Sequence, residues 1–386
     1  MEVADLDRDG YLDIIISNGN ELQTSEAGQP LPGSFIYWGS AAGWPVTERS
    51  ELPIVLTRAC AVADMNNDGH LDLVFGQQGK WGEALIFQGK GNRDFSEKIY
   101  FKGSSGAGTP GVADLNKDGL LDVAFAHDKN VLIYYQLKDG SFSEQPLKIA
   151  TMAKTMCVAD VNGDDWLDLV CPVYKKEGSR SLNSYVLLGG AKGFNLSNSI
   201  QLATDGGTGS IVSDFNNDGF QDIFFFCHRA DGSYDEIGKF GDHNTQSVIY
   251  WGSAQGFNED NNLRIASVGV HYDVGIDIGD IKSRSFVYSY TSSPYNSKGL
   301  VAKSLSWQAD LPPKTKLKLQ LRVADTKEAL EKSKWTGPTD TNSFYLESAA
   351  EIKNLKSAQW IQYRVLFDSY NGANAPILKK VQIQFE

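Results

Sequence analysis

The chain has 386 residues, enough for two domains, and its 48 acidic against 36 basic residues give a net charge of −12. This acidic balance argues against nucleic acid as a partner, because phosphate backbones are bound mainly by lysine and arginine. Apolar residues make up 41% of the chain, which is typical of folded domains, and no apolar run approaches the roughly 20 residues of a membrane span.

Five nine-residue segments repeat along the chain with the pattern Asp-x-Asp/Asn-x-Asp-Gly-x-x-Asp, with one departure at the sixth place. We call them loops one to five, and they cover residues 5–13, 64–72, 114–122, 160–168 and 214–222. A short run of β-forming residues precedes and follows each loop. Each loop is therefore predicted to join two strands, which we call A and B.

A third β-forming segment, strand C, follows each loop at residues 36–39, 86–89, 133–136, 186–189 and 249–252. The stretch from this segment to the next loop has almost the same length each time, whereas the stretch from a loop to its strand C varies more than twofold in length. The constant part has room for a fourth strand, D. Four strands in each repeat of roughly 50 residues predict the blades of a β-propeller. The same spacing predicts a degenerate sixth loop at residues 277–285.

The alternating strand directions of such a blade separate its connections into two sets. The A–B loops and C–D turns are expected at one face, which we call the loop face. The B–C and D–A connections are expected at the opposite face, which we call the variable face because all the length variation lies in the B–C connections. Variable connections on a rigid scaffold are where ligands commonly bind.

The loops concentrate three or four carboxylates in each hairpin. Two such charges about 4 Å apart repel by roughly 4 kcal/mol at an effective dielectric constant near 20. Oxygen ligands at places one, three, five and nine, with a backbone carbonyl at place seven, are typical of calcium binding. The predicted ligands of about five Ca²⁺ ions are Asp5, Asp7, Asp9, Tyr11, Asp13, Asp64, Asn66, Asp68, His70, Asp72, Asp114, Asn116, Asp118, Leu120, Asp122, Asp160, Asn162, Asp164, Trp166, Asp168, Asp214, Asn216, Asp218, Phe220 and Asp222.

Two other interpretations of the loops are less favoured. An EF-hand needs flanking helices and a bidentate Glu at place twelve, where this chain has apolar residues or cysteine. Plain polar turns would explain one such loop, but five in register favour metal binding. Loop four has Asp165 where the other loops have Gly, and we expect it to be the weakest site if that place requires a positive φ.

The loops resemble the FG-GAP or VCBS repeats of integrin-α-type propellers, which also occur in fungal propeller lectins and exported bacterial proteins. The resemblance covers about residues 1–297. It implies an all-β, calcium-stabilised propeller, commonly of seven blades, with ligand sites away from the calcium. About six blades are recognisable and no C and D strands precede Val3, so we expect the N-terminus to be truncated. No signal peptide is recognisable, yet the resemblance implies an extracellular, cell-surface or periplasmic location.

Residues 298–386 are predicted to form a β-sandwich. Apolar and polar residues alternate over residues 317–323, 361–367 and 381–385, as in strands with one buried face. The segment loosely resembles accessory β-sandwich modules of bacterial surface proteins, which implies either glycan binding or a packing and spacing role.

The variable face offers a set of polar and aromatic candidates for contact with a glycan. These ligand candidates are Asn18, Gln77, Trp81, His127, Tyr174, His228, Tyr234 and His243. Aromatic rings and amides suit carbohydrate, although polar residues at strand ends are often merely exposed. His228 and His243 flank the longest B–C connection, where an acid–base or metal site competes with a solvated polar loop.

The four cysteines leave two interpretations open. Cys157 and Cys171 each lie three residues from loop four, so they could face each other across the hairpin as a disulfide. Otherwise they are small buried apolar residues.

The sequence favours an extracellular binding or adhesion module for a glycan or a protein, with a structural spacer as another possibility. The main alternative is a propeller-type polysaccharide lyase or glycosidase. An enzyme would require two carboxylates, or a histidine with an arginine or tyrosine, to meet at the variable face.

Overall fold

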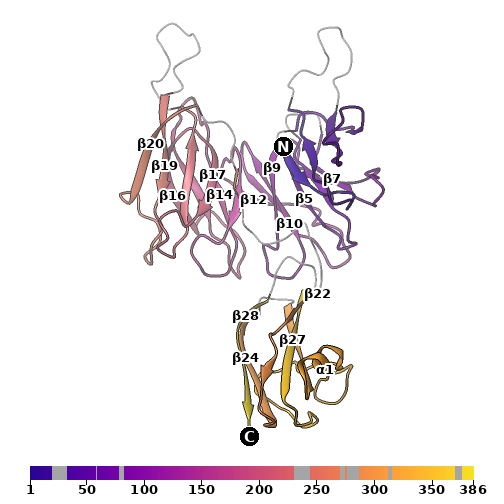
Figure 1. Cartoon of the computed structure of the whole chain (residues 1–386). Helices are drawn as coiled ribbons and strands as arrows, with labels where there is room; N and C mark the ends of the chain where they lie inside the picture. The colour runs from indigo at the N-terminus through magenta and orange to yellow at the C-terminus, as the bar shows by residue number, and fades with distance from the viewer. Residues whose placement is uncertain are drawn as a thin grey trace. The chain divides into compact units, whose positions relative to one another are not determined.

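A computed structural model describes residues 1–19, 33–57, 59–77, 82–229, 244–269, 274–275, 287–311, 315–369 and 376–386. The chain divides into two compact units, Met1–Lys282 and Ser283–Glu386. The described residues are almost entirely β-strand and turn, with one short helix, α1 (Lys327–Lys332), which confirms the predicted all-β class. No helix in these ranges has the length and hydropathy to cross a bilayer. Figure 1 shows the sheets coloured along the chain.

The described residues of the first unit form five consecutive sheets, each pairing its strands A–B–C–D in antiparallel order. The first two sheets are β1 (Glu2–Ala4), β2 (Asp13–Ile16), β3 (Ser34–Tyr37), β4 (Arg49–Leu52), and β5 (Cys60–Ala63), β6 (Asp72–Phe75), β7 (Leu85–Gln88), β8 (Glu97–Tyr100). The third is β9 (Ala107–Ala113), β10 (Asp122–His127), β11 (Val131–Tyr134), β12 (Leu147–Ile149). The last two are β13 (Cys157–Ala159), β14 (Asp168–Cys171), β15 (Ser181–Leu187), β16 (Ser199–Asp205), and β17 (Gly207–Ser213), β18 (Asp222–Cys227), β19 (Asn244–Tyr250), β20 (Asn262–Val268).

Consecutive sheets meet through their A strands, as the blades of a propeller do. Strand β1 contacts β5, β5 contacts β9, β9 contacts β13, and β13 contacts β17. Strand β21 (Val274–Gly275) pairs with β17 in parallel, which is where the A strand of a sixth blade belongs. The degenerate loop predicted at residues 277–285 lies outside the described residues.

Hydrophobic side chains fill the space between neighbouring sheets. Ile15 and Ile36 of the first sheet share a buried cluster with Leu73 and Phe87 of the second. Similar clusters join the third sheet to the fourth and the fourth to the fifth. Each fully buried Leu, Ile or Phe contributes about 1.5–3 kcal/mol, so this packing provides the rigid frame on which the loops are held.

The connections separate into two faces as expected. Arg93, in the C–D turn of the second sheet, donates to Asp7 of loop one at 2.7 Å, so A–B loops and C–D turns share the loop face. At the opposite ends of the strands, the amide of Thr57 in a D–A connection donates to the carbonyl of Asn18 in a B–C connection at 2.9 Å.

The second unit is a β-sandwich that begins earlier than the sequence predicts. One sheet holds β22 (Val287–Thr291), β27 (Trp360–Ser369), β23 (Tyr295–Asn296) and β25 (Thr315–Ala324), and the other holds β26 (Ala350–Glu351), β24 (Ala302–Asp310) and β28 (Ile377–Phe385). Leu305 of one sheet shares a core with Leu319 and Val365 of the other. A boundary at 297/298 would separate β22 and β23 from β27, with which both pair.

All four cysteines are buried and none forms a disulfide, so the disulfide alternative is not realised. Cys157 lies in β13 and Cys171 in β14, the strands that flank loop four. Burial in apolar surroundings raises the pKa of the Cys157 thiol to about 12. These cysteines therefore act as small core residues.

Candidate calcium loops and the variable face

Each loop folds its carboxylates back over its own backbone in the same way. In loop two, Asp64 accepts from the amides of Asp68 and Gly69 at 3.2 and 3.0 Å. Asn66 accepts from the Asp68 amide at 3.0 Å, and Asp68 accepts from the His70 amide at 2.8 Å. All four bonds recur at the equivalent places of the other four loops. The oxygens of places one, three and five are thus positioned by the backbone amides of places five, six and seven rather than left to solvent.

The ninth aspartate has a second role that the sequence pattern does not reveal. Asp122 is fully buried, and its two oxygens accept from the Leu115 amide at 3.0 Å and the Gln136 amide at 2.8 Å. The first of these amides lies in loop three and the second follows strand C. Four equivalent aspartates, Asp13, Asp72, Asp168 and Asp222, are likewise buried and make the same two bonds. This residue therefore clamps the A–B hairpin to strand C.

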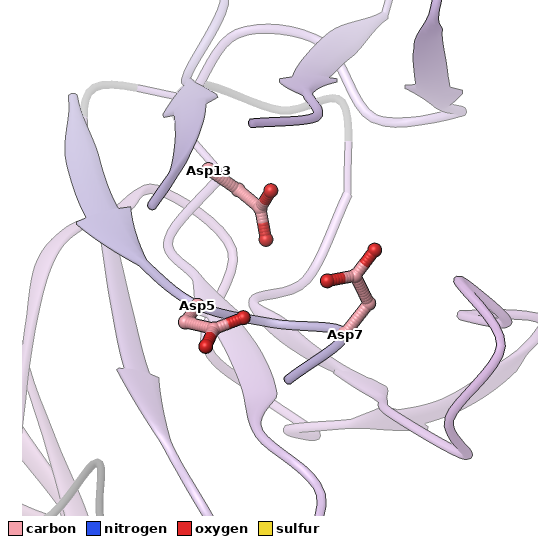
Figure 2. A group of neighbouring side chains, drawn as sticks. All are labelled: Asp5, Asp7 and Asp13. Atoms are coloured by element: carbon pink, nitrogen blue, oxygen red, sulfur yellow. The ribbon is translucent and has the colours of Figure 1, made fainter. Parts of the chain in front are cut away.

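Loop one brings three predicted ligands together. Oxygens of Asp5, Asp7 and Asp13 lie within 4.8 Å of one another, and Figure 2 shows their carboxylates around a common space. Asp7 also pairs with Arg93, whose Nε lies 2.7 Å from the Asp7 carboxylate and whose guanidinium lies 4.6 Å from the centre of the Trp38 ring. Loop one has aspartate at its third place where the other loops have asparagine, and Arg93 offsets the additional charge of Asp7.

The buried carboxyls of the loops lie in surroundings that favour a counter-ion. Desolvation, together with the smaller effect of the neighbouring carboxylates of Asp68 and Asp64, raises the pKa of Asp72 to about 7. The same causes raise the pKa of Asp168 to about 7, and burial with nearby acidic residues raises that of Asp122 to about 8. The donor set consists of oxygen atoms only, which fits a hard cation such as Ca²⁺ better than Zn²⁺.

The seventh-place residues were expected to contribute only a backbone carbonyl. Their amides donate to the fifth-place carboxylate in every loop, and the side chains of Tyr11 and Phe220 are 44% and 41% exposed. Side chains that reach solvent in this way are not held over the loop. The carbonyl ligation of Tyr11, His70, Leu120, Trp166 and Phe220 stays a prediction.

Loop four reaches the common conformation by a different distribution of glycine. The sixth place has a positive φ in all five loops, including Asp165 at 68°, as the sequence argument anticipated. The fourth place also has a positive φ in all five loops, and here loop four has Gly163 where the others have larger residues. Loop four therefore has backbone strain at place six, where Asp165 replaces glycine, but it avoids the strain that the other loops have at place four, where it has Gly163. That loop four is the weakest site stays a prediction, but backbone strain no longer supports it.

The variable face brings two of the predicted ligand residues together. Tyr174, which follows β14, and His228, which follows β18, lie with Oη and Nδ1 3.3 Å apart. The guanidinium of Arg180 lies 4.2 Å from the centre of the Tyr174 ring, and the ammonium of Lys154 lies 5.2 Å from it. We call these four residues the Tyr174 cluster. Arg180 and His228 are 5% and 4% exposed, and Arg229 beside His228 is 6% exposed.

The other predicted ligand residues do not join this cluster in the described structure. Asn18 donates to the Gly33 carbonyl at 3.4 Å, and Gln77 donates to the Val55 carbonyl at 3.1 Å. His127 accepts from the Lys129 amide at 3.0 Å, and its other nitrogen lies 3.3 Å from the Ser105 carbonyl. The polar groups of these side chains therefore form hydrogen bonds with the backbone of the connections around them. Trp81, Tyr234 and His243 lie outside the described residues.

Arg180 and Lys154 are not among the ligand residues predicted from the sequence. Neither belongs to a repeated motif, because Arg180 lies in the variable B–C connection and Lys154 in a D–A connection. Arg180 reaches Tyr174 within their shared connection between β14 and β15, whereas Lys154 is brought to it from the neighbouring connection, where its amide donates to the Pro172 carbonyl at 2.9 Å.

Replacing the buried clamp is expected to destabilise the protein even without calcium. Asp122→Ala leaves two buried amides without an acceptor, which costs about 2–5 kcal/mol of unfolding free energy. The measurement is urea unfolding in calcium-free buffer. Asp139→Ala, which removes an exposed carboxylate from the C–D turn of the same sheet, should cost less than about 1 kcal/mol. Equal losses in the two variants would contradict the clamp.

Exchanging the glycine of loop four tests the backbone argument. Asp165→Gly should stabilise the protein by up to about 1 kcal/mol, because the residue has a positive φ. Gly163→Ala should destabilise it by a similar amount, and strain is the cause because an added Cβ meets nothing within 4 Å. Thermal unfolding with calcium present measures both. The two substitutions must change the melting temperature in opposite directions. A change in the same direction would show that side-chain contacts outweigh backbone strain.

Comparison with known proteins supports the repeat assignment. The family model described as FG-GAP-like repeat matches residues 64–125 and 114–171. No curated protein sequence matches the chain.

Solved structures with distant likeness include the V. cholerae biofilm matrix protein Bap1, at 12% identity and a TM-score of 0.40, covering 99% of this chain and 68% of that one. BBS1N in complex with ARL6DN has 10% identity and a TM-score of 0.39, covering 97% and 92%. A glycoside hydrolase family 43 arabinoxylan arabinofuranohydrolase from Bacillus subtilis, in complex with cellotetraose, has 11% identity and a TM-score of 0.32, covering 100% and 96%. The repeat match and the five consecutive sheets together identify a chain that contains FG-GAP-like repeats in a β-propeller-like architecture.

Proposed function

We propose that the protein is a calcium-stabilised propeller module that binds a glycan or protein ligand outside the cell through its variable face. The shared loop geometry is the observation that carries this proposal. Five loops hold oxygen donors at places one, three, five and nine by the same hydrogen bonds, although their intervening residues differ. A common arrangement of this kind supports a common ligand, and Ca²⁺ fits its donor chemistry.

The same chemistry supports an extracellular setting. Calcium sites in extracellular modules have dissociation constants of about 10⁻⁴–10⁻³ M, and millimolar calcium outside cells fills them. Loops of a propeller that depend on such sites would lose their counter-ion in the cytosol, where carboxylates such as Asp5, Asp7 and Asp13 would repel one another.

The Tyr174 cluster is the part of the variable face best suited to a ligand. It combines an aromatic ring and a phenol with basic side chains drawn from two neighbouring sheets. A tyrosine ring offers an apolar face for a sugar, and basic groups favour a carboxylate or sulfate. These features support an acidic saccharide more specifically than a neutral one.

The same cluster supports a second candidate function. A histidine, a tyrosine and an arginine at one site form the arrangement that a polysaccharide lyase would need. One of Tyr174 and His228 would remove the proton beside a uronate carboxylate, and the electron pair left behind would form a carbon–carbon double bond. The glycosidic carbon–oxygen bond would break, and its oxygen would take up a proton from the other of these two side chains. Arg180 would offset the charge of the uronate.

Chelation tests the metal. EDTA should lower the melting temperature by several degrees and excess calcium should restore it, because each site filled at 100 times its dissociation constant adds about 2.7 kcal/mol. Asp68→Ala should lower the bound calcium by one ion per chain. Asp94→Ala, which removes an exposed carboxylate outside the loops, should leave the ion count unchanged. An unchanged melting temperature and no bound calcium would contradict the proposal.

Glycan binding and turnover distinguish the two functions. Polygalacturonate and alginate should bind with calcium present, and Tyr174→Ala should weaken binding about five- to ten-fold. Tyr100→Ala, at an exposed tyrosine of β8, should not weaken it. The binding function predicts no rise in the ultraviolet absorbance of unsaturated sugar. A rise that Tyr174→Phe or His228→Ala removes would identify a lyase instead.

A further inference from the structure

The β-sandwich unit has a groove between its two sheets at one open edge. Tyr290 of β22, Tyr363 and Phe367 of β27, and the segment Leu378–Val381 of β28 line a hollow of about 490 Å³. The first three residues come from one sheet and the segment comes from the other. We call this hollow the sandwich groove. Its size lies within the range of sites for small ligands.

The tyrosines of β22 belong to the face of the sheet that packs in the core, yet they remain exposed. Tyr290 pairs with Val365 and Tyr288 pairs with Phe367, and cross-strand partners point to the same face. Val365 is fully buried, whereas Tyr290 and Tyr288 are 50% and 51% exposed. The second sheet therefore covers β27 but leaves the edge strand β22 uncovered, and aromatic rings are presented at an accessible position.

A bulge brings basic side chains to the opposite wall of the groove. In the pairing of β24 with β28, Gln308 faces Lys380 and Ala309 faces Leu378, so Lys379 is an extra residue in β28. Such bulges re-aim side chains, and here four consecutive residues of one strand line the groove. Lys379 and Lys380 are both exposed, and Lys379 pairs with Asp310 at 2.6 Å.

The charge of the whole unit favours the same ligand chemistry. Residues 283–386 contain 15 lysines and arginines against 9 aspartates and glutamates, a net charge of +6. The first unit contains 21 against 39, a net charge of −18. The basic residues of this chain are therefore concentrated in the unit that contains the groove.

We propose that the sandwich groove is a second binding site, separate from the propeller, for a short segment of an acidic saccharide. Two tilted tyrosine rings, with centroids 6.1 Å apart, offer apolar faces and phenol groups to a sugar. Lys379 and Lys380 attract its carboxylate or sulfate. A protein partner fits less well, because seven lining residues are far fewer than the roughly 20–30 that each side of a stable protein interface contributes.

Affinity electrophoresis of the full chain, with calcium present, tests the proposal by measuring how strongly a polysaccharide in the gel retards the protein. Alginate, polygalacturonate and heparin should retard the wild-type protein, and neutral dextran should not. Tyr290→Ala should weaken retardation about five- to ten-fold, and Lys380→Glu should weaken it and reduce its salt dependence. Tyr295→Ala and Lys332→Glu remove exposed residues of the same unit that do not line the groove, and should bind as the wild type does.

Binding at the sandwich groove can be tested separately from binding at the Tyr174 cluster. Combining Tyr174→Ala with each groove variant assigns any loss to one unit or the other, so failure of this proposal leaves the proposed function testable. Wild-type binding by both Tyr290→Ala and Lys380→Glu would overturn the proposal, and so would equal binding of dextran. A dimer in size-exclusion chromatography that Tyr290→Ala dissociates would overturn it too, because the groove would then be an interface with a second copy.

Discussion

The structure of the first unit depends on the pair of hydrogen bonds that the ninth aspartate of each loop makes. A carboxylate such as Asp122 joins an amide of its own loop to an amide that follows strand C, so it fixes the hairpin to the neighbouring strand at the rim of the sheet. Burial makes this arrangement expensive for a charged group. The pKa of Asp122 is raised accordingly, and a divalent cation in the same loop would offset both the burial and the nearby Asp114 and Asp118. Fold and proposed metal site therefore share one residue.

The repeated architecture was predictable because it is encoded by spacing. The almost constant length of chain between strand C and the next loop implies fixed strands, and all five sheets follow that prediction. The conformation of the loops was only partly predictable. The positive φ of Asp165 followed from the glycines at the same place, but the positive φ at place four did not, since residues such as Arg8 and Lys117 gave no sign of it.

The variable face resisted prediction for the opposite reason. Tyr174 and His228 are 54 residues apart in the sequence. They lie in two B–C connections that differ in length and in composition. Their meeting depends on backbone bonds between neighbouring sheets, which no pattern within one repeat specifies. The domain boundary was misplaced for a related reason. β22 and β23 are short segments that acquire strand structure by pairing with β27, a partner from a distant part of the chain.

The two proposed binding surfaces use the same chemistry on units of opposite charge. The first unit has a net charge of −18, and the basic side chains around Tyr174 are an exception to this excess of acidic residues. Even five bound Ca²⁺ ions would leave the unit with a negative net charge. The second unit has a net charge of +6, and Lys379 and Lys380, which line the sandwich groove beside Tyr290 and Tyr363, have the same sign as the unit. Long-range attraction of an acidic polymer therefore favours the sandwich, while the propeller can hold such a polymer only through close contacts. Because a polymer repeats its binding unit, two modest sites on one chain would together hold it more tightly than either alone.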